Sequence, residues 1–310
     1  MTFMIQSLLL VVGFVMLVKG ADWFVDGSSS LARRFGIPQL VIGLTIVAMG
    51  TSAPEAAVSI AAALKGNADI TIGNIVGSNI LNILIILGVS SLLTNLEVAK
   101  STIRAEIPFM LVITAVLMLQ GRDGVVGLGN GLVLLLLFAV YLAYLFQMAM
   151  KNRETVEEEV VQRPLWRNLA MTGVGLVLIV WGSNVTVDAA TALARIFGMS
   201  ERFIGLTIVA LGTSLPELFT SVNAARKGNA DIAIGNIVGS NIFNILFVVG
   251  LSGLITPVPF ADLFVIDTLV AMAAAAVLGG FCMKKGKLVN WNGVVMLVGY
   301  GAYLGWLLMK

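Results

Sequence analysis

The stretch GLTIVAMGTSAPE at residues 43–55 recurs as GLTIVALGTSLPE at residues 205–217. The likeness continues without a gap through GNADITIGNIVGSNILNIL (66–84) and GNADIAIGNIVGSNIFNIL (228–246). One constant shift along the chain, which we call the repeat displacement, therefore relates two long copies and carries Glu55 onto Glu217. Each of these glutamates lies in an otherwise apolar stretch. The chain is thus a duplication, and we expect its function at the polar residues that both copies share.

The composition is that of an integral membrane protein. Hydrophobic residues make up 58% of the chain and charged residues 12%, far from the values of soluble domains. The net charge of +2 arises from cations scattered through short loops, which argues against nucleic-acid binding. The chain has no histidine and a single cysteine, Cys282, which excludes an internal disulfide and the usual zinc and haem ligands. We expect no cofactor and no enzymatic activity, and the polar chemistry must come from oxygen atoms.

Ten apolar runs are long enough to cross roughly 30 Å of hydrocarbon. They lie at residues 3–25, 38–64, 71–93, 104–120, 125–149, 167–188, 202–225, 232–255, 262–282 and 289–309. The predicted fold is all-α, with five spans in residues 1–150 and five in 167–310, joined by a cytoplasmic linker at 151–166. Because five is odd, the second unit enters the bilayer from the opposite side. The two repeats, with duplicated motifs at 43–84 and 205–246, are therefore predicted to have inverted topology.

The cationic residues predict the orientation, since cytoplasmic loops carry the excess of Lys and Arg. The loops after spans 1, 3, 5, 7 and 9 hold Arg33, Arg34, Lys100, Arg104, Lys151, Arg153, Arg163, Arg167, Arg226, Lys227, Lys284, Lys285 and Lys287. The opposite side holds only Lys65, Arg122, Arg195, Arg202 and Lys310. This asymmetry predicts a multi-pass protein of the cell (inner) membrane with both termini outside the cytoplasm.

The two glutamates are singled out by their depth. A charged side chain at the bilayer centre costs roughly 3 kcal/mol, so one kept there needs a partner or an aqueous cavity. Each glutamate follows Gly-Thr-Ser-X-Pro, and the proline and glycine predict that helices 2 and 7 are broken beside it. Such a break frees carbonyl and hydroxyl oxygens, and inside a membrane these are tolerated only where they are buried in protein or line a water-filled cavity. The candidate oxygen ligands are Ala48, Thr51, Ser52, Ala210, Thr213 and Ser214.

A second polar element follows in each copy. Spacings of four place three polar residues on one helical face, and these are Asn74, Ser78 and Asn82 in one copy and Asn236, Ser240 and Asn244 in the other. Asn79 and Asn241 are expected to point roughly 100° away from that face. Two carboxylates with hydroxyl, carboxamide and carbonyl oxygens form a hard-cation site for Ca²⁺ or Na⁺. The alternative, that small polar residues merely pack helices, does not explain a carboxylate in both halves.

Two further sets of charged residues recur in both copies, and we expect structural roles for them. The repeat displacement relates Asp26 to Asp188, and we favour a structural role for both at span ends. The matched Lys-Gly-Asn-Ala-Asp connections begin at Lys65 and Lys227. Their aspartates are expected to cap helices, with ion attraction at a pore mouth as the alternative.

GTSAPE with GNIVGSNILN, and GTSLPE with GNIVGSNIFN, resemble the paired motifs of the cation/calcium antiporter superfamily, specifically its sodium/calcium exchanger branch in the short prokaryotic, inner-membrane form. The resemblance covers essentially the whole chain. It implies alternating access, in which Na⁺ entering down its gradient drives Ca²⁺ out through one shared site.

The resemblance also implies roles for individual residues. Glu55 and Glu217 would be central ligands shared by Ca²⁺ and Na⁺. Further oxygens would come from Thr51, Ser52, Thr213 and Ser214, from the carbonyls of Ala48 and Ala210, from Ser78 and Ser240 at flanking sodium positions, and from Asn82 and Asn244 in the middle.

Two sequence differences from related branches narrow the choice of coupling ion. Some archaeal and potassium-dependent relatives have aspartate at the position of Asn244, so asparagine argues against potassium dependence. The proton/calcium branch carries additional acidic residues where this chain has Gly-Ser-Asn, so proton coupling is the weaker alternative. A cation channel is the alternative outside the antiporters. We expect Ca²⁺, Na⁺ and the lipid bilayer as partners, no required protein partner, and a monomer as the working unit.

Overall fold

The computed structural model describes residues 2–65, 68–151, 164–198 and 210–309, and it is all-helical apart from four two-residue strands in these ranges. Eight helices there are long and apolar enough to cross a membrane, and the bent pair Gln39–Thr51 and Ala53–Leu64, at an angle of 50°, makes a ninth. The start of the predicted span at 202–225 lies outside the described residues. Ten helices therefore remain a prediction.

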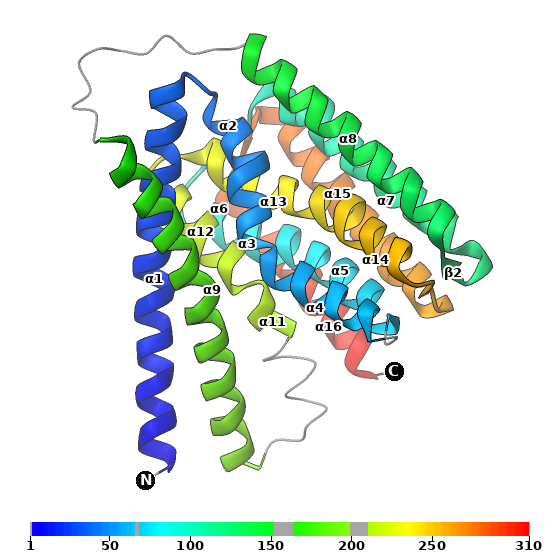
Figure 1. The fold of residues 1–310 in the computed structure, drawn as a ribbon, viewed down its shortest axis with the longest axis horizontal. Helices are drawn as coiled ribbons and strands as arrows, with labels where there is room; N and C mark the ends of the chain where they lie inside the picture. Colours follow the sequence, from blue (N-terminus) through cyan, green and yellow to red (C-terminus); the bar gives the residue numbers. More distant parts are fainter. Residues whose placement is uncertain (1, 66–67, 152–163, 199–209, 310) are drawn as a thin grey trace.

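The first half consists of long helices interrupted at matched points (Figure 1). Its elements are α1 (Thr2–Phe35), α2 (Gln39–Ile42), η1 (Gly43–Val47), α3 (Ala48–Thr51), α4 (Ala53–Leu64), α5 (Asp69–Leu81), η2 (Asn82–Leu87), α6 (Gly88–Leu93), β1 (Leu96–Glu97), η3 (Thr102–Glu106), α7 (Ile107–Gln120), η4 (Gly121–Asp123), β2 (Val125–Val126) and α8 (Leu128–Lys151).

The second half follows the same order. Its described elements are α9 (Leu165–Ile196), α11 (Ala210–Thr213), α12 (Leu215–Arg226), α13 (Ala230–Phe243), η6 (Asn244–Val249), α14 (Gly250–Ile255), β3 (Val258–Pro259), α15 (Asp262–Lys285), β4 (Lys287–Leu288) and α16 (Asn290–Met309).

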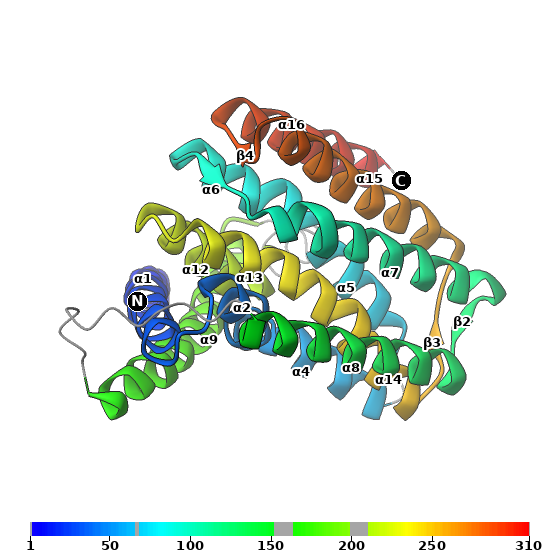
Figure 2. The same ribbon diagram turned by 90° about the horizontal axis from the view of Figure 1, so that it is seen from above.

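Helices α1 and α9 form an antiparallel pair at one edge of the bundle (Figures 1 and 2). They approach closely because glycines line the contact: a Cβ at Gly20 would lie 2.9 Å from the carbonyl oxygen of Gly175. The predicted ends of these spans were wrong, because α1 continues to Phe35 and α9 to Ile196. The apolar runs stop earlier, but the Ser, Leu, Ala and Arg residues that follow are compatible with helix.

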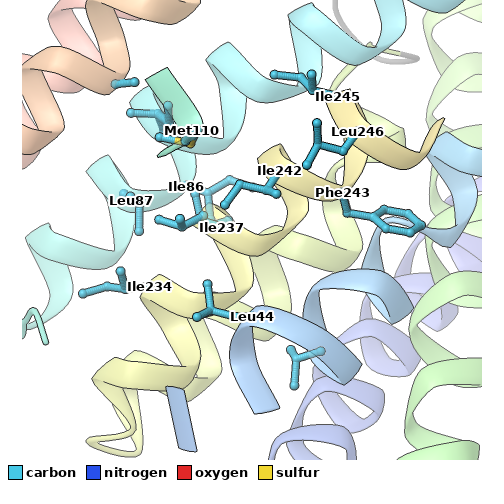
Figure 3. Packing of buried hydrophobic residues seen from close by; sticks show 14 of the residues in the cluster. Leu44, Ile86, Leu87, Met110, Ile234, Ile237, Ile242, Phe243, Ile245 and Leu246 are labelled. Atoms are coloured by element: carbon cyan, nitrogen blue, oxygen red, sulfur yellow. The ribbon is translucent and has the colours of Figure 1, made fainter. Parts of the chain in front are cut away.

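The duplicated motifs form the buried interior of the bundle. The span Ala230–Ile255 is 94% buried in its apolar window and Ile70–Leu93 78%, whereas Asn290–Met309 is only 11% buried. Helix α13 contacts α2, η1 and α3 of the other half. Leu44, Ile86 and Ile237 lie among the apolar side chains of this interface in Figure 3. The remaining helices surround this core and present apolar side chains outward, as a lipid environment requires.

Two π-helical segments interrupt the central helices at equivalent places. Both η2 and η6 begin at the asparagine that ends its polar motif, Asn82 or Asn244. A π-helical turn inserts an extra residue into the hydrogen-bond ladder and is frequent at functional sites. The local backbone thus departs from α-helix where the sequence places its candidate ligands.

Short antiparallel strand pairs connect the halves. β1 pairs with β4 through Leu96 opposite Leu288, and β2 pairs with β3 through Val126 opposite Val258. The repeat displacement carries β1 onto β3 and β2 onto β4. Each half therefore pairs the same two strands with the other half.

Candidate ion-binding site

Both predicted helix breaks occur at the serine of the Gly-Thr-Ser motif. Ser52 (φ −80°, ψ 8°) separates α3 from α4, and Ser214 (φ −91°, ψ 5°) separates α11 from α12. A proline occupies the first turn of each following helix, where its missing N–H leaves no helical bond unmade. The same first turns contain Glu55 and Glu217, near a helix N-terminus that favours negative charge.

The two glutamates are fully buried, with 0% exposure. Ser52 Oγ of the first half donates to Glu217 Oε1 of the second at 2.8 Å. Ser214 Oγ of the second half donates to Glu55 Oε1 of the first at 3.4 Å, and Ser78 Oγ donates to the same oxygen at 3.4 Å. Each broken helix therefore places its hydroxyl on the carboxyl group of the other half.

Further oxygens surround this pair. Ser78 Oγ and Ser214 Oγ are also 3.1 Å apart, so hydroxyl groups of both halves meet at Glu55. Thr51 Oγ1 donates to Asn236 Oδ1 at 3.0 Å. The carbonyl of Ala48 accepts hydrogen bonds from Thr51 and from Ser240, both at 3.3 Å. Residues of both predicted motifs thus meet at one place.

Asn82 and Asn244 are also buried at this interface, with 0% exposure. Their side-chain amides donate across it, Asn82 Nδ2 to Asn241 Oδ1 at 3.0 Å and Asn244 Nδ2 to Asn79 Oδ1 at 3.2 Å. Their Oδ1 atoms have no hydrogen-bond partner in the described part of the chain. These two oxygens remain available as ligands.

Thr213 and Ala210 are placed less completely than the other predicted ligands. Thr213 ends α11 and lines a cavity beside α4. Ala210 begins α11, and its side chain lies outside the described residues. Both therefore remain predicted ligands, and their position in α11 puts them next to the break at Ser214.

Sequence reasoning missed Ser59 and Ser221. Asn74 Nδ2 donates to Ser59 Oγ at 3.0 Å and to the carbonyl of Glu55 at 3.3 Å. Asn236 Nδ2 repeats this with Ser221 Oγ at 2.8 Å and the carbonyl of Glu217 at 3.4 Å. The repeat displacement relates the two serines, and this match was the available signal. These contacts hold the backbone of each glutamate in place.

Asn79 and Asn241, predicted to point away from the ligand face, form the seam between the halves. Asn79 Nδ2 donates to the carbonyl of Asn241 at 3.2 Å, and Asn241 Nδ2 donates to the carbonyl of Asn79 at 3.1 Å. This reciprocal pair lies where α5 meets α13. The side-chain oxygens of the pair accept the amide protons of Asn82 and Asn244 and so position both residues.

Among the described residues, the two carboxyl groups have no protein counter-ion. Glu55 Oε2 and Glu217 Oε2 have no hydrogen-bond partner, and no Lys or Arg within the described ranges pairs with either group. Removing an unpaired carboxylate from water costs several kcal/mol. Hydroxyl, carboxamide and carboxylate oxygens are the ligands of hard cations. The site can therefore offset this cost by binding such a cation.

A cavity of about 510 Å³ lies between α4, α9 and α11. Its lining includes Pro54 and Thr213, which adjoin the two helix breaks, and Asn184 and Asp188 of α9. This partly polar cavity therefore adjoins both helix breaks, and Glu55 follows its lining residue Pro54 in the chain.

Comparison with known proteins agrees with these features. The profile of the family described as "Sodium/calcium exchanger protein" matches residues 5–147 and again 167–309. The chain is 37% identical to "Inner membrane protein YrbG" of Escherichia coli (strain K12), with 99% of this chain and 97% of that protein covered. It is 32% identical to "Sodium/calcium exchanger MaX1" of Methanosarcina acetivorans, with 97% of each covered.

The fold is also similar to solved structures. A structure of the sodium–calcium exchanger NCX_Mj, soaked with 2.5 mM Na⁺ and 0.1 mM Ca²⁺, matches with a TM-score of 0.85 at 31% identity. The match covers 97% of this chain and 98% of that one. Because the family profile matches both halves and the fold agrees over nearly the whole length, the chain belongs to the sodium/calcium exchanger family of multi-pass membrane proteins.

Proposed function

We propose that the protein is a secondary antiporter that exchanges Ca²⁺ for Na⁺ by alternating access at one shared midplane site. The observation that carries this proposal is the crossed arrangement at the two buried glutamates, where Ser52 bonds Glu217 and Ser214 bonds Glu55. Because each half supplies part of the other's ligand shell, a rearrangement between the halves alters the whole site at once. Single occupancy by competing ions then couples their movements.

The two halves, residues 1–150 and 167–310, are inverted repeats in this proposal. The antiparallel packing of α1 against α9 and the reciprocal strand pairs support it. The family profile matches each half separately, which supports the same division. The cation distribution supports an inner-membrane orientation with both termini outside the cytoplasm.

Charge balance limits the exchange. One Ca²⁺ neutralises Glu55 and Glu217, and two Na⁺ do the same. A third Na⁺ would make the loaded site one charge more positive, and transport would then respond to voltage by about 2.3 kcal/mol per charge per 100 mV. The further proposed ligands are the oxygens of Thr51, Ser52, Thr213 and Ser214, the carbonyls of Ala48 and Ala210, Ser78 and Ser240 at the flanking sodium positions, and Asn82 and Asn244 in the middle.

Calcium flux in proteoliposomes tests the proposal. ⁴⁵Ca²⁺ uptake should require an opposing Na⁺ gradient and should be lost in Glu55→Gln and in Glu217→Gln. Glu106→Gln is the matched control, because Glu106 is buried between other helices and bonded to Tyr144. Uptake driven only by a proton gradient, or only when K⁺ is present, would replace the sodium assignment. Conductance far above carrier turnover without a counter-ion would identify a channel.

A further inference from the structure

A lysine bridge joins α1 to the core at one face of the bundle. Lys227 follows α12, the helix that begins beside Glu217, and its Nζ lies 2.5 Å from Asp22 Oδ1 and 2.7 Å from Asp26 Oδ1 on α1. Asn229 Nδ2 donates to Ser29 Oγ at 3.2 Å further along α1. Burial lowers the pKa of Lys227, but the hydrogen bonds to the two aspartates outweigh it and leave the pKa raised. The lysine is therefore a cation in this bridge.

The duplication supplies a counterpart on the opposite face. The repeat displacement carries Lys65 onto Lys227 and Asp26 onto Asp188. Because α1 and α9 are antiparallel, Asp26 lies near the start of α9, and Asp188 lies toward the start of α1. The contacts that a Cβ at Gly27 would make with Asn168, and one at Gly13 with Thr186, establish this direction.

The counterpart is not joined in this conformation. Within the residues that the structure describes, Lys65 and Asp188 form no ion pair with each other, and both are exposed. Asp188 and Asn184 instead line the cavity of about 510 Å³ between α9 and α4. The Lys227 bridge thus joins α12 to α1, whereas the matching residue Asp188 lines a cavity and is not joined to Lys65.

We propose that these two matched sets are alternate closures that determine which face of the membrane the ion site opens to. Lys227 with Asp22 and Asp26 holds one face shut in the present conformation. In the opposite conformation this bridge opens, the cavity closes, and Lys65 pairs with Asp188. The inference rests on the proposed alternating-access function and names the residues that position α1 and α9 in each state.

The two closures are unequal in charge. The residue that matches Asp22 is Asn184, so the formed bridge contains two carboxylates and its counterpart contains one. Partly exposed ion pairs contribute little to stability, which allows each closure to break and re-form during a cycle. The extra carboxylate biases the protein toward the conformation described here. Asp22→Asn should weaken this bias, and Asn184→Asp should strengthen the opposite closure.

Site-specific labelling measures that bias directly. In a Cys282→Ser background, Ala57→Cys places a thiol at an exposed position in the cavity. Lys227→Ala removes the ion pairs that favour the conformation in which this cavity is open, so a smaller fraction of the protein has an accessible thiol. The rate of reaction with a membrane-impermeant maleimide should therefore fall roughly twofold or more. Adding Lys65→Ala to that variant should restore the rate, because it removes the competing closure. Arg226→Ala, a neighbouring cation that pairs with neither Asp22 nor Asp26 in the described ranges, should leave the rate unchanged.

Charge exchange separates a bridge from a structural lysine. Lys227→Asp should slow labelling, and Lys227→Asp combined with Asp26→Lys should recover it. Equal rates in all these variants, or a further decrease on adding Lys65→Ala, would overturn the inference. If Lys227 variants fail to give monodisperse protein, Asn184→Asp must still slow labelling. Labelling needs no ion flux, so a negative flux experiment would reject the exchange proposal, and a negative labelling experiment would reject only the closures.

Discussion

The serines at the helix breaks are unusual residues because each acts on the opposite half. Ser52 donates to Glu217 at 2.8 Å, whereas Ser59, further along α4, accepts from the amide of Asn74. Ser52→Ala removes a proposed ligand oxygen together with the hydroxyl that positions Glu217. We expect the apparent Ca²⁺ affinity to fall roughly tenfold, which corresponds to about 1.4 kcal/mol of binding free energy. Transport titrations check this, and an equal loss in Ser59→Ala would contradict it.

Asn244 provides a second test on a single side chain. Its Oδ1 is buried and has no hydrogen-bond partner in the described structure, so Asn244→Asp adds a third carboxylate where an oxygen already stands. We expect exchange by this variant to require an additional monovalent cation, because the two-glutamate site would become one charge more negative. Flux measured with and without K⁺ gives the answer. Asn130→Asp, at the start of α8, is the control and should behave like the unmodified protein.

Between elements, a buried acid–tyrosine contact joins α8 to η3. Tyr144 donates to Glu106 Oε1, and Glu106 is 1% exposed. Tyr144→Phe removes this bond from a buried carboxyl group and should cost about 1–3 kcal/mol of stability. Thermal unfolding in detergent measures the loss. Tyr300→Phe removes a hydroxyl that has no hydrogen bond within the described ranges, so a comparable loss there would contradict the argument.

A similar contact in the second half joins α15 to α16, where Tyr303 donates to Asp267 Oδ1 at 2.9 Å. Under the repeat displacement, Asp267 matches Ala105 rather than Glu106, and Tyr303 matches Tyr141 rather than Tyr144. Each half therefore has an acid–tyrosine hydrogen bond between two helices, but the residues that form it do not lie at equivalent positions of the repeat. Sequence matching alone could not find this relation.

Across the whole molecule, ion binding and stability are linked. The site gathers charged and polar groups from both halves, so a bound cation should oppose their separation. Ca²⁺ at a hundred times its dissociation constant would stabilise the folded state by about 2.7 kcal/mol. We expect chelation to lower Tm and Ca²⁺ to restore it, and the effect should vanish in Glu55→Gln. Glu106→Gln should retain the response, and a response that persists in Glu55→Gln would place the bound ion elsewhere.

Hydropathy and short motifs were enough to predict the class of the protein, its duplication, the burial of Glu55 and Glu217, and a helix break beside each glutamate. These features follow from the apolar content of a span and from the backbone chemistry of proline, which act over a few residues. The ends of α1 and α9 were misjudged because helix propensity continues beyond the apolar run.

The packing of the two halves decides which side chains of the site meet, and the local sequence does not. Ser52 and Glu217 are 165 positions apart, and Asn79 and Asn241 are 162 apart. The contact made by Asn79, the bridge at Lys227 and the cavity beside Asp188 all depend on how those halves pack. Helical periodicity predicts the face of one helix, but the partner of that face is a property of the folded molecule, because it is set by contacts between distant segments.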